Sequence, residues 1–295
     1  MNNIAVIGAG TMGNGIAHIF AQFGFNLHLV DISEMALNSG IANISNNLDR
    51  MIAKDKITED KKNKILNNIK GFTNLKQAVK EVDLVVEAVA ENIDLKLKTF
   101  KDLDTFTDKN TILASNTSSI SITQIAAATN IPERVIGMHF MNPVPIMKLV
   151  EIIRAYNTSD EVLDKTIKLT KKINKIPVKV NDYPGFVANR ILMPMINESV
   201  EALYNGVAGV IEIDTVMKLG MAHPMGPLQL ADFIGLDVCL SILQVMYSEF
   251  KNPKYAICPL LTNMVRAGKL GVKSGEGFYD YTKSKKAEIV SKMFL

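Results

Sequence analysis

His139 is the residue of this chain whose chemistry best suits taking a proton from an alcohol. It lies near the end of the apolar run 135–140, which is typical of a buried strand. Oxidation of an alcohol by hydride transfer needs a group that accepts the hydroxyl proton, and histidine titrates near neutral pH. A histidine at a strand end can also be purely structural, so His139 alone leaves both interpretations open.

Glu151 is the candidate partner of His139. The predicted strand 148–153 follows His139 after a turn that contains two prolines, so it could return beside the first strand. A carboxylate on the far imidazole nitrogen would fix the tautomer and stabilise the imidazolium form. A carboxylate in an apolar strand can equally be a structural ion-pair partner, and that alternative also stays open.

A glycine-rich turn near the N-terminus predicts a nucleotide site. Gly8, Gly10 and Gly13 follow the apolar run 4–7 and lead into helical spacing. Gly8 would permit the tight turn, Gly10 the close approach of a pyrophosphate, and Gly13 the close packing of helix on strand. The N-terminus of that helix, with Thr11 and Met12 in its first turn, offers free N–H groups to phosphates. The alternative is a glycine turn without a ligand.

Asp31 completes the pattern of a dinucleotide-binding fold. It ends a second apolar strand, 26–30, about 20 residues beyond the glycines. Asp31 is placed to accept hydrogen bonds from ribose hydroxyls, and its charge would repel a 2′-phosphate. Ile32 and Ser33 offer no arginine to receive one. The site should therefore prefer NAD, with NADP less favoured.

The alternation of strands and helices up to residue 183 predicts an α/β, Rossmann-type, doubly wound and mostly parallel sheet. The predicted strands are 4–7, 26–30, a strand at Phe72, 83–89, 112–115, 135–140, 148–153 and 178–180. The predicted helices are 33–56, 58–69, 75–80, 95–103, 120–129 and 160–173.

The sequence pattern changes at 182–185, and almost no strands are predicted after that point. Helices are predicted at 186–204, with Pro194 inside, and at 213–219, 227–250 and 259–267. Two domains follow: an NAD-binding domain, 1–183, and an all-helical domain, 184–295. The second domain has many apolar positions for its size, which suggests that it buries surface against another subunit and contributes to a substrate cleft.

Polar residues follow several predicted strands of the first domain. Glu91, Asn116, Ser118 and Asn142 each come shortly after a strand ends. Ligands of open parallel sheets bind at that edge. Ser118 could donate to a substrate oxygen or cap the next helix. Asn189 could project an amide into a cleft between the domains, or serve as a cap or an interhelical hydrogen bond.

Composition excludes several classes of function. With 33 basic and 30 acidic residues, the net charge of +3 gives no electrostatic case for nucleic acid. No stretch reaches the apolar length of a membrane span. Cys239 and Cys258 have no metal or redox spacing and are expected to be free thiols. We therefore expect a cytoplasmic protein without a membrane partner.

Taken together, the motifs resemble the L-3-hydroxyacyl-CoA dehydrogenase family, especially its short bacterial 3-hydroxybutyryl-CoA members. The resemblance covers essentially the whole chain. The segments that carry it are 8–13, 85–91, 115–119, 139–145, 148–151, 182–190, 218–220, 224–227 and 275–279.

The resemblance implies a role for each matching residue. His139 would be the general base with Glu151 as its partner, and Ser118 and Asn189 would contact the reacting oxygens of the substrate. Asn47 and Lys54 would meet the CoA portion, although Asn47 stands where the family has a serine. The residues implied at the NAD site are Gly8, Gly10, Thr11, Met12, Gly13, Asp31, Glu91, Lys96, Asn116, Ser118, Asn142 and Lys273.

The implied activity is the interconversion of (S)-3-hydroxybutyryl-CoA and acetoacetyl-CoA with NAD(H). The implied partners are an acyl-CoA substrate and a second copy of the chain, as a homodimer or higher homo-oligomer, and no metal is implied. Two alternatives remain: the same fold acting on a small hydroxy acid without CoA, and a relative that binds nucleotide without catalysis.

Overall fold

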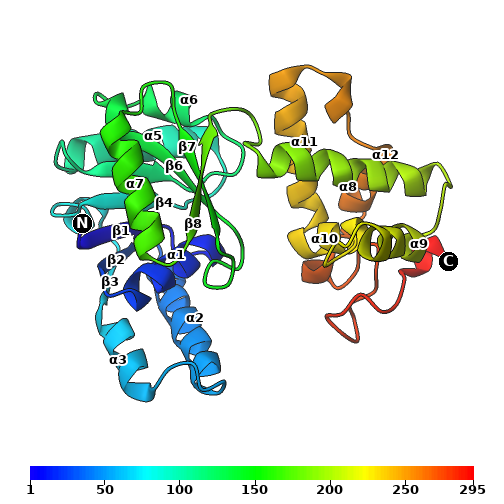
Figure 1. Ribbon diagram of the computed structural model, residues 1–295, viewed down its shortest axis with the longest axis horizontal. Coiled ribbons are helices and arrows are strands. Elements are labelled where there is room, and N and C mark those ends of the chain that lie inside the picture. The colour runs from blue at the N-terminus through cyan, green and yellow to red at the C-terminus, as the bar shows by residue number, and fades with distance from the viewer. The chain divides into compact units, whose positions relative to one another are not determined.

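The computed structural model describes residues 1–295 and divides into two compact units, Met1–Tyr183 and Pro184–Leu295 (Figure 1). The first unit is built on one sheet. The second is helical, and its extended backbone is confined to isolated bridges between residues 271 and 290.

The sheet of the first unit has eight strands in the order β3-β2-β1-β4-β5-β6-β7-β8. All neighbouring pairs are parallel except β6 and β7, which are antiparallel. This arrangement confirms the predicted doubly wound, mostly parallel sheet. The strands are β1 (Asn3–Ile7), β2 (Asn26–Val30), β3 (Ile69–Phe72), β4 (Leu84–Glu87), β5 (Ile112–Ser115), β6 (Val135–Phe140), β7 (Leu149–Arg154) and β8 (Ile176–Asn181).

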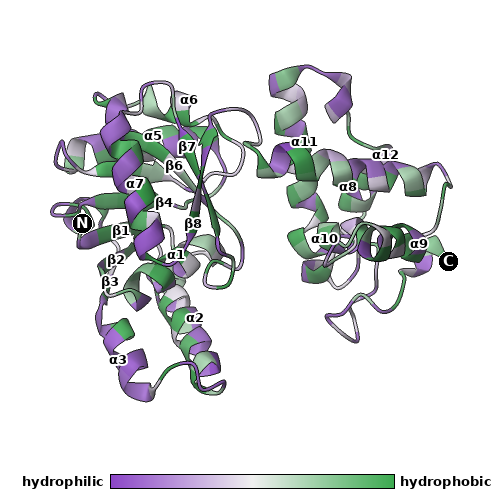
Figure 2. Ribbon diagram, in the orientation of Figure 1, coloured by the Kyte–Doolittle hydropathy of each residue, from purple (hydrophilic) through white to green (hydrophobic).

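The strand order reverses between β1 and β4, which are neighbours in the interior of the sheet. Residues of these strands are buried on both faces, as the continuous apolar runs indicated, and β4 is buried at every position. Figure 2 shows the contrast between the green strands and α7 (Asp160–Lys172), on which purple and green bands alternate. Ligands of such sheets bind beyond the carboxyl ends of the strands beside the switch point.

The remaining helices of the first unit match the predicted ones in place; most are shorter than predicted, whereas the helix predicted at 95–103 extends over 93–106. They are α1 (Thr11–Gln22), α2 (Glu34–Ile52), α3 (Glu59–Asn67), α4 (Leu75–Ala78), α5 (Ile93–Phe106), α6 (Ile122–Ala126) and the 3-10 turn η1 (Pro132–Arg134). Figure 1 shows α2 and α3 extending from the sheet as a pair. The predicted cap Thr58 accepts a hydrogen bond from the backbone N–H of Lys61 at the start of α3.

The second unit packs its helices around its own apolar core. The elements are α8 (Ala188–Tyr204), α9 (Val210–Thr215), the π-helical turn η2 (Val216–Gly220), α10 (Pro227–Ile234), α11 (Leu236–Phe250), η3 (Pro253–Tyr255), α12 (Pro259–Arg266), η4 (Val272–Ser274) and η5 (Lys292–Phe294). The buried carboxylate of Asp232 on α10 accepts hydrogen bonds from the backbone N–H of Phe278 and of Tyr279 and from the hydroxyl of Tyr281. These bonds fix the C-terminal segment on the helices.

The predicted single helix 227–250 was wrong. The chain bends by 96° between α10 and α11 at Gly235, whose φ of +105° is rarely adopted by residues with a side chain. Apolar periodicity continues through this glycine, and for that reason the sequence pattern gave no sign of the break. No helix of the chain taken singly has the length and apolar character of a membrane span, although this bent pair passes the same test when its two helices are combined.

Candidate active site

His139 and Glu151 face each other across the antiparallel pair β6 and β7. They occupy directly opposed positions in the register, and His139 Nδ1 lies 2.8 Å from Glu151 Oε2. His139 is 8% exposed and Glu151 2%. The predicted return of the second strand beside the first is thus confirmed, and the carboxylate orients the ring through Nδ1. The other ring nitrogen, Nε2, points away from Glu151, and its exchange of a proton with a substrate stays a prediction.

The glycine turn needs two of its glycines for the reasons predicted, Gly8 for the tight turn and Gly13 for the close packing of the helix. Gly8 has a φ of +99°, and a Cβ there would stand 2.6 Å from the carbonyl oxygen of Ala88 beyond β4. A Cβ on Gly13 would stand 1.7 Å from the carbonyl oxygen of Gly8. Both positions therefore require glycine, because the turn and helix α1 leave no room for a side chain.

Gly10 differs, because a Cβ there would meet nothing within 4 Å. It caps α1 without a side chain, so no side-chain oxygen occupies the N–H groups of the first turn, formed by Thr11, Met12 and Gly13. Asp31 lies at the end of β2, and its carboxylate accepts hydrogen bonds from the backbone N–H of Ala9 and of Ser33. An open helix N-terminus beside a fixed carboxylate fits the pyrophosphate and ribose of a dinucleotide.

Lys96 lies in a buried cluster of charges beyond β4. Its Nζ is 2.7 Å from Glu87 Oε1 and 3.3 Å from Glu91 Oε2, and the Lys96 and Glu87 side chains are almost fully buried. Glu87 also accepts hydrogen bonds from Ser115 Oγ on β5 and from the backbone N–H of Val89. The ammonium of Lys96 is therefore held at the strand ends by two carboxylates.

Glu91 joins this cluster to the loop after β5. Its Oε1 accepts hydrogen bonds from the hydroxyls of Thr117 and Ser119 and from the backbone N–H of Ser118. Burial acts to raise the pKa of Glu91, but the Lys96 ammonium and these hydrogen bonds outweigh it and hold that pKa below its ordinary value. Glu91 is therefore a carboxylate at neutral pH.

Ser118 does not cap the next helix, so the capping interpretation was wrong. The cap of α6 is Ser121, whose Oγ accepts from the backbone N–H of Gln124 and donates to Asp182. Asp182 also accepts from the backbone N–H of Ile122 and of Thr123. Ser118 thus remains in the loop beyond β5, at the edge where the other candidate residues lie.

Asn116 ties the neighbouring strands β5 and β6 together at this edge. Its Oδ1 accepts a hydrogen bond of 2.9 Å from the backbone N–H of Phe140, the residue after His139. Asn142 follows shortly after and is exposed, in a cis peptide bond with Pro143. The structure thus places the predicted residues Glu91, Asn116 and Ser118 at the carboxyl edge of the sheet that also carries His139.

Two predicted site residues belong to the helical unit. Asn189 is buried in the first turn of α8; Val187 occupies the N-cap position there, so Asn189 is not the cap. Lys273 lies in η4, with its Nζ 2.7 Å from Asp237 Oδ2. Their contacts with cofactor or substrate stay predictions.

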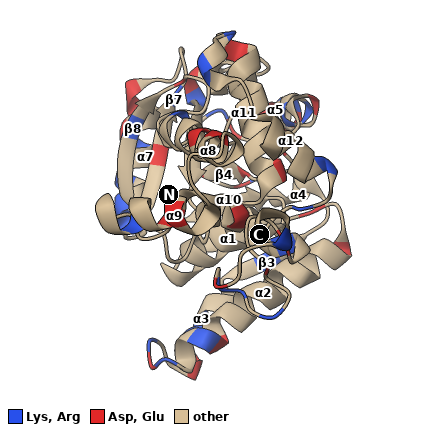
Figure 3. Ribbon diagram, turned by 90° about the vertical axis from the view of Figure 1, so that its right-hand side faces the viewer, with Lys and Arg blue, Asp and Glu red and all other residues tan.

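The predicted CoA contacts lie at the far end of α2. Asn47 is on α2 and accepts a hydrogen bond from Arg50, whereas Lys54 is exposed just beyond the helix end. Figure 3 shows basic and acidic residues together on the neighbouring α3. This helical pair therefore offers single cations rather than a uniformly basic surface, and the CoA contacts stay predictions.

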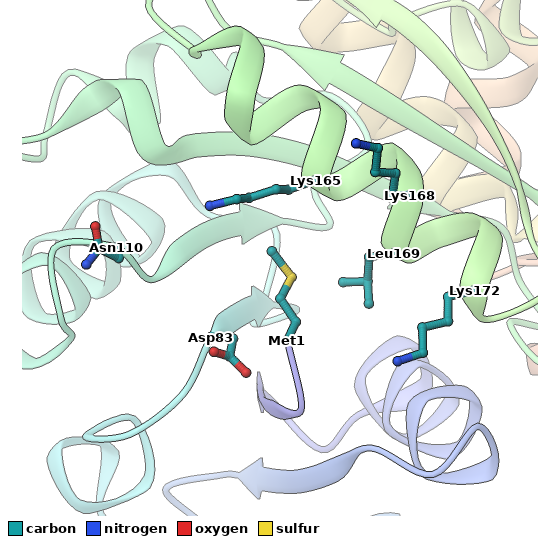
Figure 4. Close-up of a pocket in the computed structure, with 7 residues that line it drawn as sticks. All are labelled: Met1, Asp83, Asn110, Lys165, Lys168, Leu169 and Lys172. Carbon is teal, nitrogen blue, oxygen red and sulfur yellow. The ribbon is translucent and has the colours of Figure 1, made fainter.

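A pocket of about 410 Å³ lies elsewhere in the first unit (Figure 4). Met1, Asp83 and Asn110 line it and precede β1, β4 and β5 respectively, so the pocket is at the amino ends of the strands. Lys165, Lys168, Leu169 and Lys172 of α7 complete the lining. None of the predicted site residues lines this pocket, and it lies at the edge opposite to the glycine turn.

Sequence reasoning assigned no role to Glu87, Thr117 or Ser119, which position the predicted residues Lys96 and Glu91. Glu87 carried a usable signal, because a carboxylate inside the apolar run 84–89 must find a partner when it is buried. The hydroxyls of Thr117 and Ser119 carried none, since adjacent serines and threonines in a loop have many local uses.

Comparison with known proteins shows the family of this chain. Residues 3–183 match the family model "3-hydroxyacyl-CoA dehydrogenase, NAD binding domain", and residues 185–281 match "3-hydroxyacyl-CoA dehydrogenase, C-terminal domain". A probable 3-hydroxybutyryl-CoA dehydrogenase of Bacillus subtilis is 52% identical, over 95% of this chain and 98% of that protein. A 3-hydroxybutyryl-CoA dehydrogenase of Bradyrhizobium diazoefficiens is 49% identical, over 97% of each chain.

Comparison with a solved structure indicates the same family. The crystal structure of (S)-3-hydroxybutyryl-CoA dehydrogenase from Ralstonia eutropha superposes with a TM-score of 0.92 at 50% identity. The match covers 96% of this chain and all of that one. The chain therefore belongs to the 3-hydroxyacyl-CoA dehydrogenase family of oxidoreductases, with the family's NAD-binding domain in its first unit.

Proposed function

We propose that the protein interconverts (S)-3-hydroxybutyryl-CoA and acetoacetyl-CoA with NAD(H). The observation that carries the proposal is the contact of 2.8 Å between His139 Nδ1 and Glu151 Oε2 in a buried strand pair. That contact supplies a proton acceptor with its ring already oriented, next to the edge at which the dinucleotide is expected. The relatives named above act, by their names, on the same substrate.

In this proposal, His139 takes the hydroxyl proton of the substrate at Nε2. The Glu151 carboxylate stabilises the imidazolium that results, because its negative charge lies against Nδ1 in surroundings with little water to screen it. In the reverse direction the imidazolium returns the proton to the oxygen formed from the ketone. Bound NAD supplies the hydride acceptor, and NADH the donor.

The other predicted residues are proposed to hold the reactants. Ser118 and Asn189 would donate hydrogen bonds to the reacting oxygens, where charge develops. The glycine turn, Asp31, Glu91, Lys96, Asn116, Asn142 and Lys273 would hold NAD, and Asn47 and Lys54 the CoA portion. Asp31 favours NAD over NADP, because its carboxylate at the end of β2 would repel a 2′-phosphate.

We also propose a homo-oligomer, a dimer at the least, that forms through the helical unit. Large apolar side chains of this unit are exposed, among them Val207, Val216 and Leu219 at 75%, 59% and 82%. Exposed apolar surface of this kind is typical of protein interfaces. Light scattering of the purified protein tests this proposal.

A cytoplasmic location is supported by Cys239 and Cys258, which are both free thiols.

The experiment that tests the activity follows NADH oxidation with acetoacetyl-CoA, with and without His139→Gln. The wild type should turn over and the variant should lose about 100-fold or more, as is usual when a general acid–base is removed. Free acetoacetate in place of acetoacetyl-CoA tests the alternative without CoA. A variant as fast as the wild type would remove His139 from the mechanism, and NADH binding without turnover would favour a non-catalytic relative.

A further inference from the structure

The loop 141–148 connects the strand of His139 to the strand of Glu151. It begins after β6 and ends at β7, and it contains Asn142, one of the proposed NAD contacts. Within the loop, the backbone N–H groups of Ile146 and Met147 both donate to the carbonyl oxygen of Pro143 at 3.0 Å. Its side chains are mostly exposed, with Ile146 at 73%. The loop therefore needs contacts from elsewhere in the fold to hold one position.

Lys175 supplies such contacts from beneath the loop. It lies between α7 and β8 and is only 5% exposed. Its Nζ donates to the carbonyl oxygens of Val144 at 2.5 Å and of Met147 at 2.6 Å. Burial lowers the pKa of Lys175, while the two carbonyl oxygens accept hydrogen bonds from its ammonium group.

The ammonium of Lys175 makes no ion pair with a carboxylate, in contrast to Lys96. Desolvating an ammonium is costly, and an ion pair is the usual compensation. Here the compensation comes from two carbonyl groups of the same loop, through charge-assisted hydrogen bonds that are about twice as strong as neutral ones. The ammonium of Lys175 therefore serves to fix the position of that loop.

Helix α1 holds the other side of the same loop. Val144 is buried against Gly15, where an added Cβ would stand 3.0 Å from the Val144 side chain. His18, one turn further along α1, is buried near Lys175, and burial lowers its pKa to about 4. His18 is thus neutral at physiological pH, and Lys175 is the charged member of this neighbouring pair.

We propose that Lys175 is a positioning residue of the reaction, which holds the loop 141–148 so that Asn142 and the His139–Glu151 pair keep a fixed relation to helix α1. The inference rests on the proposed function. Helix α1 offers its N-terminus to the pyrophosphate, and the loop lies between that helix and the catalytic strands. Loosening the loop should therefore misplace the reacting groups while the Gly8–Gly13 turn and Asp31 continue to bind the adenosine half of the cofactor.

The test uses the full-length protein with Lys175→Met, which removes the ammonium and keeps an apolar stem. Lys175→Gln, which keeps a neutral donor, is the second variant, and Lys171→Met at the exposed end of α7 is the matched control. NADH fluorescence counts binding sites and gives the Kd for NADH. Acetoacetyl-CoA reduction is then expressed as kcat per NADH-binding site, so that a partly unfolded preparation does not count as a loss. Hydrogen exchange follows the amides of Ile146 and Met147.

We expect Lys175→Met to lower kcat per site by about 10- to 100-fold, the usual cost of a misplaced reacting group. Lys175→Gln should fall between it and the wild type, and the control should match the wild type. The Kd for NADH should change by less than about threefold, because the adenosine half binds elsewhere. The amides of Ile146 and Met147 should exchange faster in both Lys175 variants, with those of β6 and β7 unchanged.

The inference is overturned if kcat per site and the exchange of the loop amides stay within twofold of the wild type in either Lys175 variant. It is also overturned if activity falls only in proportion to the number of NADH sites, since that result describes a merely structural residue. Failure of the proposed function would look different, because the wild type itself would not reduce acetoacetyl-CoA. In that case faster loop exchange would still show that Lys175 holds the loop, while its role in positioning reactants would fall.

Discussion

Replacing Glu151 by glutamine separates the two contributions that its carboxylate makes to His139. The amide has nearly the same shape and keeps an oxygen that can accept from Nδ1, so ring orientation should survive. The negative charge is lost, however, and with it the stabilisation of the imidazolium that forms when His139 takes the substrate proton. Any loss of rate in Glu151→Gln therefore measures the electrostatic part of the pair.

The size of the effect follows from the contact and its surroundings. The two side chains are 2.8 Å apart, with 10% and 3% of their side-chain surface exposed, so neither water nor salt screens the interaction appreciably. A hydrogen bond to a charged group contributes about 1.5–3 kcal/mol. Because about 1.4 kcal/mol corresponds to a factor of 10 in rate, kcat/KM should fall by about 10- to 150-fold.

The assay is NADH oxidation with acetoacetyl-CoA under steady-state conditions, together with NADH binding by fluorescence. Glu133→Gln is the matched control, because Glu133 is an exposed glutamate just before β6. Binding of NADH should be unchanged in both variants, and the unfolding temperature of Glu151→Gln should stay within a few degrees of the wild type. A Glu151→Gln enzyme with wild-type kcat/KM would refute the reasoning, since the pair would then be structural only.

Three further predictions test other parts of the molecule. Gly13→Ala should lower the unfolding temperature by about 3–10 °C, because its Cβ would stand 1.7 Å from a backbone oxygen, whereas Gly10→Ala should unfold normally and bind NADH more weakly. Asp31→Ala should raise KM for NADH by about tenfold and reduce the preference of the enzyme for NADH relative to NADPH, as measured in steady-state assays with both cofactors. Burial lowers the pKa of His18 to about 4 and raises that of Asp232 to about 7. Acidification from about pH 7 to about pH 5 should therefore destabilise the first unit by about 2 kcal/mol, because His18 takes up a proton in the unfolded state but not in the folded state. The same change should stabilise the second unit by about 2 kcal/mol, because Asp232 takes up a proton in the folded state but not in the unfolded state. Amide exchange in each unit, corrected for intrinsic rates, checks the two opposite signs.

The sheet was predictable because each of its strands is a short apolar run with a clear boundary. Strands buried on both faces need no alternation of side chains, so runs such as 84–87 stand out from the polar segments around them. The contact between His139 and Glu151 was also predictable, because a short connection brings two strands side by side. Their direct opposition depends on the register, which the sequence does not reveal.

The start of α6 shows where local reasoning ends. The run 117–121 holds several hydroxyl side chains, and any of them satisfies the rule for a cap. Ser121 is the cap because Asp182, far along the chain, accepts hydrogen bonds from Ser121 Oγ and from two backbone N–H groups of that turn. A tertiary contact therefore decides the helix start and leaves Ser118 in the loop.

Lys175 illustrates a different limit. A lysine between an α-helix and a strand is usually a solvated surface residue, and nothing in its neighbours along the chain marks it as buried. Its burial arises because β8 pairs with β7, which brings the residue before β8 beneath the loop that precedes β7. The pairing of two strands, and no local pattern, gives this lysine its contacts.

The carboxylate of Glu91 makes the proposed cofactor and substrate contacts interdependent. One of its oxygens lies 3.3 Å from Lys96 Nζ, and the other accepts from the backbone N–H of Ser118 at 3.0 Å. Lys96 is in turn fixed by Glu87, which also binds Ser115 on the next strand. Any displacement of Glu91 must therefore move or break the contacts of Ser118 as well. Because Ser118 is the proposed donor to the reacting oxygen, we expect a cofactor that engages Glu91 or Lys96 to affect the position of Ser118, so that binding of one reactant influences the alignment of the other.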